Sequence, residues 1–310
     1  MTMMKTARIH AYGDASAIRY DAVPRPRPAF GEVLVRVAAT SFNPTEAALR
    51  AGMLQSFLPV ELPYAFGWDV AGTVVEVGAG AAGFAVGDRV VGRLDRGGAA
   101  AAYVRAPAAA LVPAPASVPL AHAAALPVAG LTAWQAVFDH AKVAAGQRVL
   151  VNGAGGGVGG FVTQLARHAG AEVVATAGPR STEAVLRQGA GQVIDYTAGP
   201  VAAALDAQVD TLLNLVPLSP QDAAALAPLV RRGGRIVSIA TPITPHEDAG
   251  VSATHMVARN EVAHLAALVG LVDAGVLALD ISASHPLTDL AEVHRLSESG
   301  RIRGKVLIVP

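Results

Sequence analysis

The most constraining feature of the sequence is a glycine-rich turn between an apolar run and an amphipathic segment. Val149-Leu150-Val151 is typical of a buried parallel strand, and six glycines follow it within Gly153–Gly160. The next segment, Phe161–Gly170, repeats apolar residues at helical spacing and ends on glycine. Glycines let a backbone approach a pyrophosphate closely, and the helix that follows offers unpaired N–H groups to that anion. Strand, turn and helix in this order therefore predict a nucleotide-binding unit.

The literal G-x-G-x-x-G pattern fits as Gly155, Gly157 and Gly160. A structural turn rich in glycine would match it too, so the pattern gains its meaning from the strand and helix around it. A second strand is predicted over Glu172–Ala177, at the spacing of a βαβ unit. An NAD site needs an acid at the end of this strand, whereas Glu172 stands at its beginning.

The residues after this second strand favour NADP(H) over NAD(H). The strand leads into Gly178-Pro179-Arg180-Ser181, where a guanidinium and a hydroxyl are available to a 2′-phosphate and no carboxylate repels it. The same residues also fit the start of a helix with Ser181 as its N-cap, and the two interpretations are compatible.

Composition limits the class of protein. With 310 residues the chain is long enough for two domains, and a formal net charge of zero gives no general attraction to nucleic acid or to acidic membranes. There is no cysteine, which excludes disulfides and thiolate metal sites. The first ten residues lack the apolar core of a signal peptide, and apolar runs elsewhere are too short to span a membrane. We expect a soluble cytoplasmic protein.

The order of predicted elements indicates a β-rich domain up to about Leu120, followed by alternating strands and helices typical of a doubly wound parallel sheet. A strand, a helix and a strand at the C-terminal end suggest that the tail completes the first domain. Further strands are predicted over Ala7–His10, Ile18–Tyr20, Glu32–Ala38, Ala71–Val77, Arg89–Gly92, Ala101–Val104, Ala110–Val112, Gln192–Asp195, Thr211–Leu215, Arg235–Ile239, Ile281–His285 and Lys305–Val309. Further helices are predicted over Asn43–Gly52, Val201–Ala207, Gln221–Arg231, Glu261–Ala274 and Leu287–Ser299, and Ala121–Lys142 is expected as two helical pieces around Pro127–Thr132.

Short motifs in a fixed order give the chain a family resemblance over essentially its whole length. They are Gly31-Glu32-Val33-Leu34-Val35, Asn43-Pro44, Gly67-Trp68-Asp69-Val70-Ala71-Gly72, Gly87-Asp88-Arg89-Val90, Leu131-Thr132-Ala133-Trp134, Gly153-Ala154-Gly155-Gly156-Gly157-Val158-Gly159, Val193-Ile194-Asp195-Tyr196 and Gly304-Lys305-Val306. In these the chain resembles the zinc-independent quinone oxidoreductases of the medium-chain dehydrogenase/reductase superfamily.

The resemblance implies an α/β fold with two domains and cofactor in the cleft between them. A GroES-like β-rich catalytic domain would comprise residues 1–123 and 264–310, and a Rossmann doubly wound parallel-sheet domain residues 124–263. The reaction implied is hydride transfer from NADPH to a quinone or to the carbon–carbon double bond of an enone, in a homodimer that pairs at the Rossmann sheet edge near Arg235–Ile239.

The resemblance also implies roles for single residues. Gly156, Gly157 and Val158 would hold the pyrophosphate, Tyr196 would lie by the adenosine ribose phosphate, and Thr132 would flank the nicotinamide as a catalytic residue. Arg301 is expected to reach the phosphate from the tail. The expected cofactor-binding residues are Gly155, Gly156, Gly157, Val158, Gly178, Arg180, Ser181, Tyr196, Ala240 and Thr241.

No metal is expected to take part. Asn43 stands near the cysteine ligand of the zinc-dependent relatives, and Gly67-Trp68-Asp69 replaces their Gly-His-Glu. Without a Lewis acid the oxidation of a simple alcohol is difficult, so acceptors that are already electrophilic, such as quinones and enones, are favoured. A metal-dependent alcohol dehydrogenase is the weaker alternative.

Candidates for the chemistry beyond the cofactor are few. Asn43 is expected either to hydrogen-bond a substrate carbonyl or to act only as a helix N-cap. Leu54, Tyr64 and Trp68 are expected to line an apolar substrate pocket, although aromatic residues of a β domain often belong to the core. Two other functions stay open: a non-catalytic NADPH-binding protein, and an enoyl reductase or tailoring enzyme of secondary metabolism. The loop Thr241–Asn260 carries no readable motif.

Overall fold

In the computed structural model, which describes residues 2–310, the chain forms two units. The first unit contains the chain up to Val128 together with Asn260–Ala274 and Ile281–Pro310, and the second contains Ala129–Arg259 and Gly275–Asp280. The first unit is therefore discontinuous. The boundaries expected from the sequence for a catalytic and a cofactor domain stay a prediction.

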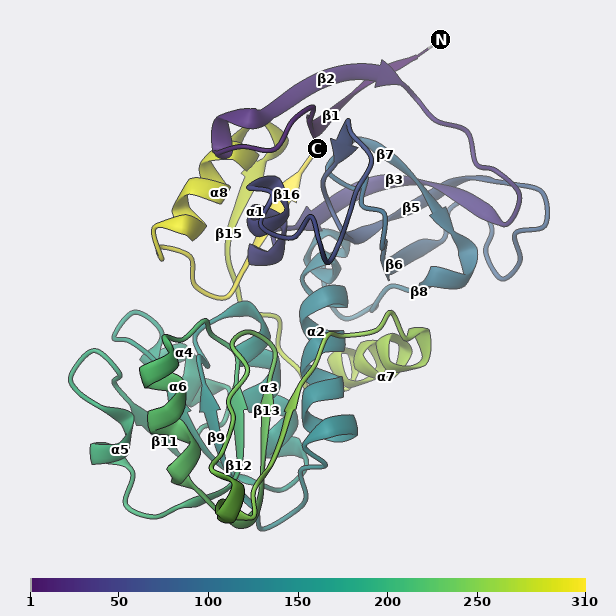
Figure 1. Ribbon diagram of the computed structural model, residues 1–310. Helices are drawn as coiled ribbons and strands as arrows, with labels where there is room; N and C mark the ends of the chain where they lie inside the picture. The colour runs from purple at the N-terminus through teal and green to yellow at the C-terminus, as the bar shows by residue number, and fades with distance from the viewer. Residues whose placement is uncertain (1) are drawn as a thin grey trace. The chain divides into compact units, whose positions relative to one another are not determined.

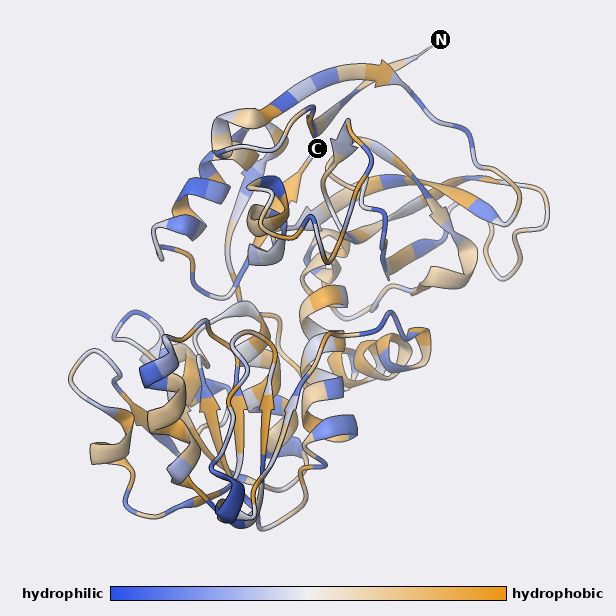
Figure 2. Ribbon diagram, viewed as in Figure 1, coloured by the Kyte–Doolittle hydropathy of each residue, from blue (hydrophilic) through white to orange (hydrophobic). Residues whose placement is uncertain are grey.

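The second unit is built on a six-stranded sheet in which every pair of neighbours is parallel. Its order is β11 (Gln192–Ile194), β10 (Glu172–Thr176), β9 (Arg148–Asn152), β12 (Val209–Asn214), β13 (Val230–Ser238) and β14 (Ser252–His255). The chain starts at β9, moves outward through β10 to β11, and then continues on the other side from β12 to β14 (Figure 1). The direction of winding reverses beside β9, which is where sheets of this class bind ligands at their carboxyl ends. Figure 2 shows these strands as the hydrophobic centre of the unit.

Helices pack along this sheet because their apolar residues recur at helical spacing. Helix α3 contacts β9 and β10, and its residues Phe161, Val162, Leu165 and Ala166 are all buried, as the sequence predicts. The helices of this part of the chain are α2 (Pro127–Trp134), a π-helical turn (Gln135–His140), α3 (Gly157–His168), α4 (Thr182–Arg187), α5 (Val201–Ala204) and α6 (Pro220–Leu226).

The first unit is mainly β-structure in two sheets. A small sheet has the order β2 (Ile18–Pro24), β1 (Met3–Ile9) and β4 (Tyr64–Ala65). A larger sheet has the order β15 (Ile281–Pro286), β16 (Lys305–Val309), β3 (Glu32–Ser41), β5 (Asp69–Val77), β6 (Arg89–Arg93) and β8 (Leu111–Pro113), with β7 (Tyr103–Pro107) paired to β3. Strands from the C-terminal tail thus complete a sheet that the N-terminal part begins.

Three helices belong to this unit: α1 (Pro44–Arg50), α7 (Val262–Asp273) and α8 (Leu290–Glu298). Helices α1 and α8 contact each other and share one hydrophobic core with β1 and β16. Short 3-10 helices lie at Ala15–Ala17, Ala108–Ala110, Leu120–Ala125, Ala227–Leu229, Glu247–Ala249 and Leu287–Asp289. None of the helices within residues 2–310 has both the length and the apolar character needed to cross a membrane.

Two predicted helical boundaries are wrong, and both involve proline. Helix α2 runs through Pro127–Thr132, which the sequence predicts as a break, because Pro127 stands at the first helical position where its missing N–H costs nothing. The helix predicted over Gln221–Arg231 ends at Leu226, and β13 already begins at Val230. Pro228 lies between them and cannot continue an α-helix.

Two strand predictions also need correction. The strand expected at Ala101–Val104 is β7, shifted to Tyr103–Pro107, while Ala101 makes an isolated bridge to Thr6. Strand β14 lies inside the loop Thr241–Asn260, where no element is expected. All four residues of β14 are exposed, so the sequence has no alternation of apolar and polar residues that would predict this strand. The family resemblance implies a sheet edge near Arg235–Ile239, but β13 lies between β12 and β14, so this segment belongs to an interior strand and not to an edge of the sheet.

Candidate functional site

The glycine turn places the start of α3 at the carboxyl end of β9. Helix α3 begins at Gly157 with Gly156 as its N-cap, four residues before the start predicted from the apolar pattern. Gly160 is the first residue whose N–H donates into the helix, to Gly156 O at 3.1 Å. Helix geometry leaves the N–H groups of Gly157, Val158 and Gly159 without acceptors inside the helix, which forms an anion-binding end.

Three glycines in the turn are required by the space around them. Gly153 has a φ of +95°, which side chains rarely adopt. A Cβ on Gly159 would lie 2.3 Å from Gly153 O, and a Cβ on Gly155 would lie 2.6 Å from Ser181 Cβ. The glycine that permits close packing of α3 is therefore Gly159 and not Gly160, whose Cβ would meet only the flexible amide of Gln188. In the G-x-G-x-x-G pattern, Gly155 is thus a position that requires glycine, whereas the glycine required inside the helix is one residue earlier than the pattern predicts.

A chain of side-chain hydrogen bonds links the carboxyl ends of β10, β9, β12 and β13. Thr176 Oγ1 donates to Asn152 Oδ1 at 2.8 Å, Asn152 Nδ2 donates to Asn214 Oδ1 at 2.9 Å, and Asn214 Nδ2 donates to Ser238 Oγ at 2.9 Å. Thr176 Oγ1 also accepts the N–H of Gly153 at 2.9 Å. We call these four side chains the strand-end network. All four are buried, and they tie the glycine turn to the neighbouring strands.

The residues expected around the adenosine lie close to the glycine turn. Ser181 lies against Gly155. Tyr196 lies beside Gly178, since a Cβ built on Gly178 would be 3.5 Å from Tyr196 Oη. Arg180 is exposed, and Tyr196 is 58% exposed, so both are accessible to a nucleotide. Ser181 is the residue before α4, but its side chain makes no capping hydrogen bond, which leaves the hydroxyl for other partners.

The residues expected near the nicotinamide lie in the same unit. Ala240 and Thr241 directly follow β13, and Thr241 Oγ1 accepts the N–H of Leu218 at 2.8 Å. Thr132 lies in α2 and is buried. Arg301 belongs to the first unit and is exposed. The roles assigned to all these residues stay predictions.

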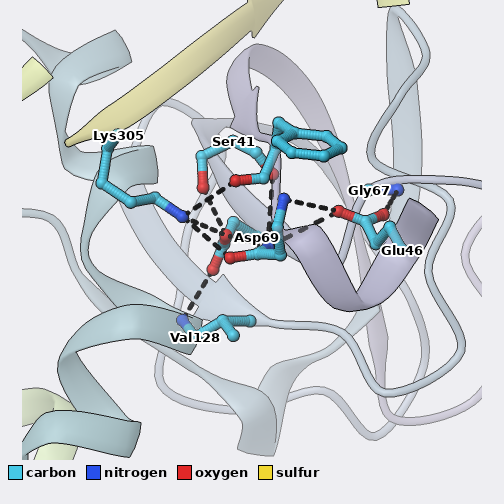
Figure 3. A network of polar contacts seen from close by, with 8 residues as sticks. Ser41, Glu46, Gly67, Asp69, Val128 and Lys305 are labelled. Atoms are coloured by element: carbon cyan, nitrogen blue, oxygen red, sulfur yellow. Dashed lines mark hydrogen bonds and ion pairs between the residues drawn. The ribbon is translucent and has the colours of Figure 1, made fainter. Parts of the chain in front are cut away.

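The first unit contains a second group of buried polar side chains, drawn in Figure 3, which we call the Asn43 network: Ser41, Asn43, Glu46, Asp69 and Lys305. Asn43 Nδ2 donates to Asp69 Oδ2 at 2.8 Å, and Lys305 Nζ donates to Asn43 Oδ1 at 2.8 Å. Ser41 Oγ donates to Asp69, and Lys305 Nζ lies 3.8 Å from Asp69 Oδ2. These side chains come from β3, α1, β5 and β16, so four elements converge on one point.

Two backbone N–H groups from outside these five residues donate to the carboxyl groups of the network. Val128 N, in the first turn of α2, donates to Asp69 Oδ1 at 2.7 Å, and Gly67 N donates to Glu46 Oε1 at 2.8 Å. Gly67 cannot be replaced without strain, because its φ is +96° and a Cβ would lie 2.3 Å from Ala100 N. The motif Gly67-Trp68-Asp69 is thus held at both ends by the Asn43 network.

Burial governs the charges of this network. Loss of water raises the pKa of Glu46 to about 7, although the Gly67 N–H bond acts in the opposite direction, and the neighbouring Asp69 raises it further. Burial also lowers the pKa of Lys305, and the carboxylates of Asp69 and Glu46 oppose that change. With Glu46 protonated, the ammonium of Lys305 and the carboxylate of Asp69 form a neutral pair in the core.

The residues expected to line a substrate pocket are core residues in this structure. Tyr64 and Trp68 are buried, and Trp68 Nε1 donates to Tyr64 Oη at 2.6 Å, so each satisfies the polar group of the other. Leu54 is partly buried and packs against the same core. Asn43 stands at the N-cap position of α1, but its side-chain oxygen faces Lys305. Whether these residues contact a substrate stays a prediction.

Sequence reasoning missed Lys305 and the strand-end network. The signal for the network was present, because Asn152, Thr176, Asn214 and Ser238 each close an apolar strand at its carboxyl end. Lys305 is the one charged residue of the strand Lys305–Val309, and its partners lie more than 200 residues away in the sequence.

Within residues 2–310, no three His, Cys, Asp or Glu side chains are grouped so that they could hold a metal ion. The second unit does fit a dinucleotide. The exposed N-cap Gly156 has open space beside it, since its ideal Cβ would meet no atom closer than 3.6 Å, and the start of α3 points its N–H groups there.

Comparisons with known proteins agree with this architecture. Residues 29–116 match the family model of the alcohol dehydrogenase GroES-like domain, and residues 188–308 match that of zinc-binding dehydrogenases. A chloroplast envelope quinone oxidoreductase homolog from Arabidopsis thaliana is 34% identical over an alignment of 335 positions, which covers 99% of this chain and 99% of the relative.

Solved structures have the same fold along the whole chain. The quinone oxidoreductase from Coxiella burnetii superposes with a TM-score of 0.89 at 27% identity and covers 100% of both chains. The mycobacterial protein Rv1454c, solved in complex with NADPH, superposes with a TM-score of 0.86 at 28% identity over 99% of this chain and 100% of that one. The expected combination of a GroES-like domain and a Rossmann domain is confirmed, and the chain belongs to the zinc-independent quinone oxidoreductase family of the medium-chain dehydrogenase/reductase superfamily.

Proposed function

We propose that this protein is an NADPH-dependent oxidoreductase that transfers a hydride to a quinone without a metal. The observation that carries the proposal is the 34% identity to a quinone oxidoreductase homolog along 99% of both chains. The glycine turn with its open helix end supports it independently, because it supplies the binding site that a dinucleotide needs.

The second unit would bind the cofactor through its backbone and strand ends. NADPH supplies the hydride when it is bound, and the protein contributes orientation and electrostatics. The N–H groups at the start of α3 would bind the pyrophosphate, while the strand-end network holds Gly153 in its unusual conformation. Thr132 and the segment Ala240-Thr241 are proposed to contact the nicotinamide.

The preference for NADP(H) rests on the residues after β10. Arg180 and Ser181 offer a guanidinium and a hydroxyl that makes no capping hydrogen bond, with Ser181 beside Gly155, and Tyr196 lies near Gly178. A 2′-phosphate is an acceptor for such donors, and charge-assisted hydrogen bonds to guanidinium are among the stronger ones.

The proposed function is tested by following NADPH oxidation through its near-ultraviolet absorbance. The acceptors are benzoquinone, naphthoquinone, phenanthrenequinone, a short alkenal and an enoyl thioester. We expect turnover with quinones. Turnover only with the alkenal or the thioester would identify a double-bond reductase, and NADPH binding without any turnover would support a non-catalytic binding protein. A matched assay with NADH tests the cofactor preference.

We also propose a homodimer and a cytoplasmic location. Strand β14 is one of the two edge strands of the parallel sheet, and its residues Ser252–His255 are all exposed, so this strand is the proposed site of pairing with a second copy. Sedimentation of the protein before and after a His255→Pro substitution tests the assembly, since proline removes a donor from the strand. Cell fractionation tests the location.

A further inference from the structure

The strand-end network of the second unit continues beyond β13, and its hydrogen bonds all run in one direction. The Asn214 Nδ2 group donates to Val216 O at 3.1 Å and to Thr241 O at 3.3 Å. Because a backbone carbonyl only accepts, these contacts place the nitrogen of the Asn214 amide on this side and its oxygen on the other.

The orientation of Asn214 determines the hydrogen bonds that follow. Its oxygen only accepts, so Asn152 presents its own Nδ2 to it, at 2.9 Å, and turns its oxygen to Thr176. The Thr176 hydroxyl must then donate to Asn152, which leaves its lone pairs for the N–H of Gly153 at 2.9 Å. A backbone N–H only donates, so the two ends of the network require the same direction.

Ser238 closes the network at the end that faces away from the glycine turn. Its hydroxyl accepts from Asn214 Nδ2 at 2.9 Å and donates to Thr241 O. Asn214 is 0% exposed and Ser238 is 1% exposed, so water does not replace a lost partner at either residue. Since the hydrogen bonds of such a buried network strengthen one another, a break at one residue weakens the rest.

The loop after β12 contacts both ends of the network. Val216 packs over the glycine turn, since a Cβ built on Gly153 would lie 2.4 Å from Val216 Cγ1. Two residues further on, Leu218 N donates to Thr241 Oγ1 at 2.8 Å, and the same hydroxyl donates to Leu218 O at 3.3 Å. Asn214 directly precedes this loop, so its amide holds the loop, the glycine turn and Thr241 together.

We propose that Asn214 is a positioning residue that couples the two ends of the dinucleotide site: through its amide, the order of the glycine turn depends on that of the segment Ala240-Thr241. The inference rests on the proposed function, in which the turn binds the pyrophosphate and this segment contacts the nicotinamide. A ligand group that holds one end in place reduces the ordering cost at the other end, so the two halves of NADPH bind cooperatively.

Two ligands separate the halves of the site. NADPH is compared with 2′-phospho-ADP-ribose, which has the same phosphates and riboses but lacks the nicotinamide. The Kd of 2′-phospho-ADP-ribose divided by the Kd of NADPH measures what the nicotinamide contributes to the affinity, and we call this quotient the nicotinamide ratio. Calorimetric titration gives both values, and thermal unfolding reports whether each variant is folded.

Thr176→Val tests the coupling from the far end, because Thr176 is bonded to Gly153 and not to the segment Ala240-Thr241. The variant should lower the nicotinamide ratio about 10-fold, within the roughly 5–150-fold range of coupled sites. Thr176→Ser keeps the hydroxyl and should keep the wild-type ratio. Thr163→Val removes a buried hydroxyl without hydrogen-bond partners and should keep it too. If Thr176→Val weakened both ligands by the same factor, the proposal would be overturned.

Asn214→Asp tests the centre of the network. The substitution keeps the size of the side chain and an acceptor for Asn152, but it replaces the donor toward Val216 and Thr241 by an oxygen. The nicotinamide ratio should fall by a similar factor. Because a buried carboxylate can prevent folding, Ser238→Ala is the second variant, which removes only the hydroxyl between Asn214 and Thr241.

A double variant shows whether the two ends act through one network. Ser238→Ala combined with Thr176→Val should lower the nicotinamide ratio by less than the product of the two single changes, because either break already weakens the same chain of hydrogen bonds. A change equal to that product would mean independent local effects and would contradict the coupling.

These titrations use no acceptor, so their outcome is separate from that of the activity assay. A fall in the nicotinamide ratio together with no turnover on any acceptor would refute the proposed function alone. Turnover with quinones together with an unchanged ratio in Thr176→Val and Ser238→Ala would refute the coupling alone. A wild-type protein that binds neither ligand would overturn both.

Discussion

The hydroxyl of Thr176 accepts the backbone N–H of Gly153 at 2.9 Å, and so connects the end of β10 to the turn that follows the neighbouring strand β9. The same oxygen donates to Asn152 Oδ1 at 2.8 Å, which starts the strand-end network. Gly153 has a φ of +95°, and this hydrogen bond is one of the contacts that keep it there. The shape of the nucleotide-binding turn therefore depends on a side chain that does not belong to it.

Thr176→Val should weaken NADPH binding and lower stability. Valine has nearly the same shape but leaves the N–H of Gly153 without its acceptor, at a cost of about 1–3 kcal/mol. Calorimetric titration with NADPH and thermal unfolding measure the two effects. Thr163→Val is the matched control, because Thr163 is fully buried in α3 and its hydroxyl has no hydrogen-bond partner. Equal behaviour of the two variants would contradict the role of Thr176.

Gly159→Ala and Gly156→Ala should separate folding from cofactor binding. A Cβ at Gly159 would lie 2.3 Å from Gly153 O, so the turn must move and the melting temperature should fall. A Cβ at Gly156 meets nothing closer than 3.6 Å, so the protein should fold normally while the methyl group obstructs the pyrophosphate. NADPH titration of both folded variants measures their affinity for the cofactor. Wild-type affinity in Gly156→Ala would contradict a pyrophosphate site at the start of α3.

Arg180→Ala should lower the affinity for NADPH far more than that for NADH. The guanidinium is expected to bind the 2′-phosphate, which NADH lacks, and a charge-assisted hydrogen bond of this kind contributes about 1.5–3 kcal/mol. Binding titrations with both cofactors measure the ratio. Arg187→Ala is the control, because Arg187 is an exposed arginine of α4 that pairs with Glu183. Parallel losses for NADPH and NADH would mean that Arg180 does not read the phosphate.

Glu46→Gln should flatten the pH dependence of stability between pH 4.5 and 7. The pKa of Glu46 is raised from 4.5 to about 7 in the folded state by burial, so the folded protein binds the proton more tightly than the unfolded chain. Stability from this group is therefore fully present at low pH and is lost as pH rises through this window, by about 3 kcal/mol. Urea unfolding across that range measures it, with a steeper slope in the wild type expected.

His294→Phe should protect the protein against acid. Burial lowers the pKa of His294 to about 3 from 6.5, and the nearby Arg50 lowers it further. The folded state requires the neutral ring, so stability is present above pH 6.5 and is lost as pH falls towards 3, by up to about 5 kcal/mol. The ring already packs edge-on against Phe42 and Phe66, with centroids 4.9 and 5.3 Å away, so phenylalanine suits the site. Unfolding at pH 4 compares the variants; equal acid sensitivity would contradict this account.

Local patterns in the sequence predict most of the fold. The apolar run at Val149-Leu150-Val151 and the glycines after it predict β9 and a helix behind the turn, because both depend on neighbouring residues, although α3 begins four residues earlier than the apolar pattern indicates. Strand β14 shows the limit of such patterns. Its residues are polar or small, and the strand exists because the backbone of β13 offers a pairing edge. An edge of that kind is a property of the folded sheet.

The candidate sites divide in the same way. The residues expected around the glycine turn, Gly155–Val158 and Gly178–Ser181, belong to one strand–turn–helix–strand pattern, so a nucleotide site could be predicted there from local spacing. The roles of Tyr196, Ala240 and Thr241 rest on the family resemblance and stay predictions. The Asn43 network could not, because Lys305 meets Asn43 across 262 positions and no periodicity links them. The identity of the last glycine in the turn also needed coordinates, since only the distance to Gly153 O distinguishes Gly159 from Gly160.

The distance in sequence between Asn43 and Lys305 has a consequence for synthesis. During translation Asn43, Glu46 and Asp69 leave the ribosome long before Lys305 is added. Until then the carboxyl groups of Glu46 and Asp69 have no lysine partner. The second unit draws nearly all its residues from one continuous stretch, Ala129–Arg259, and can mature during that interval. The nascent chain is therefore expected to fold its second unit first and to complete its first unit last.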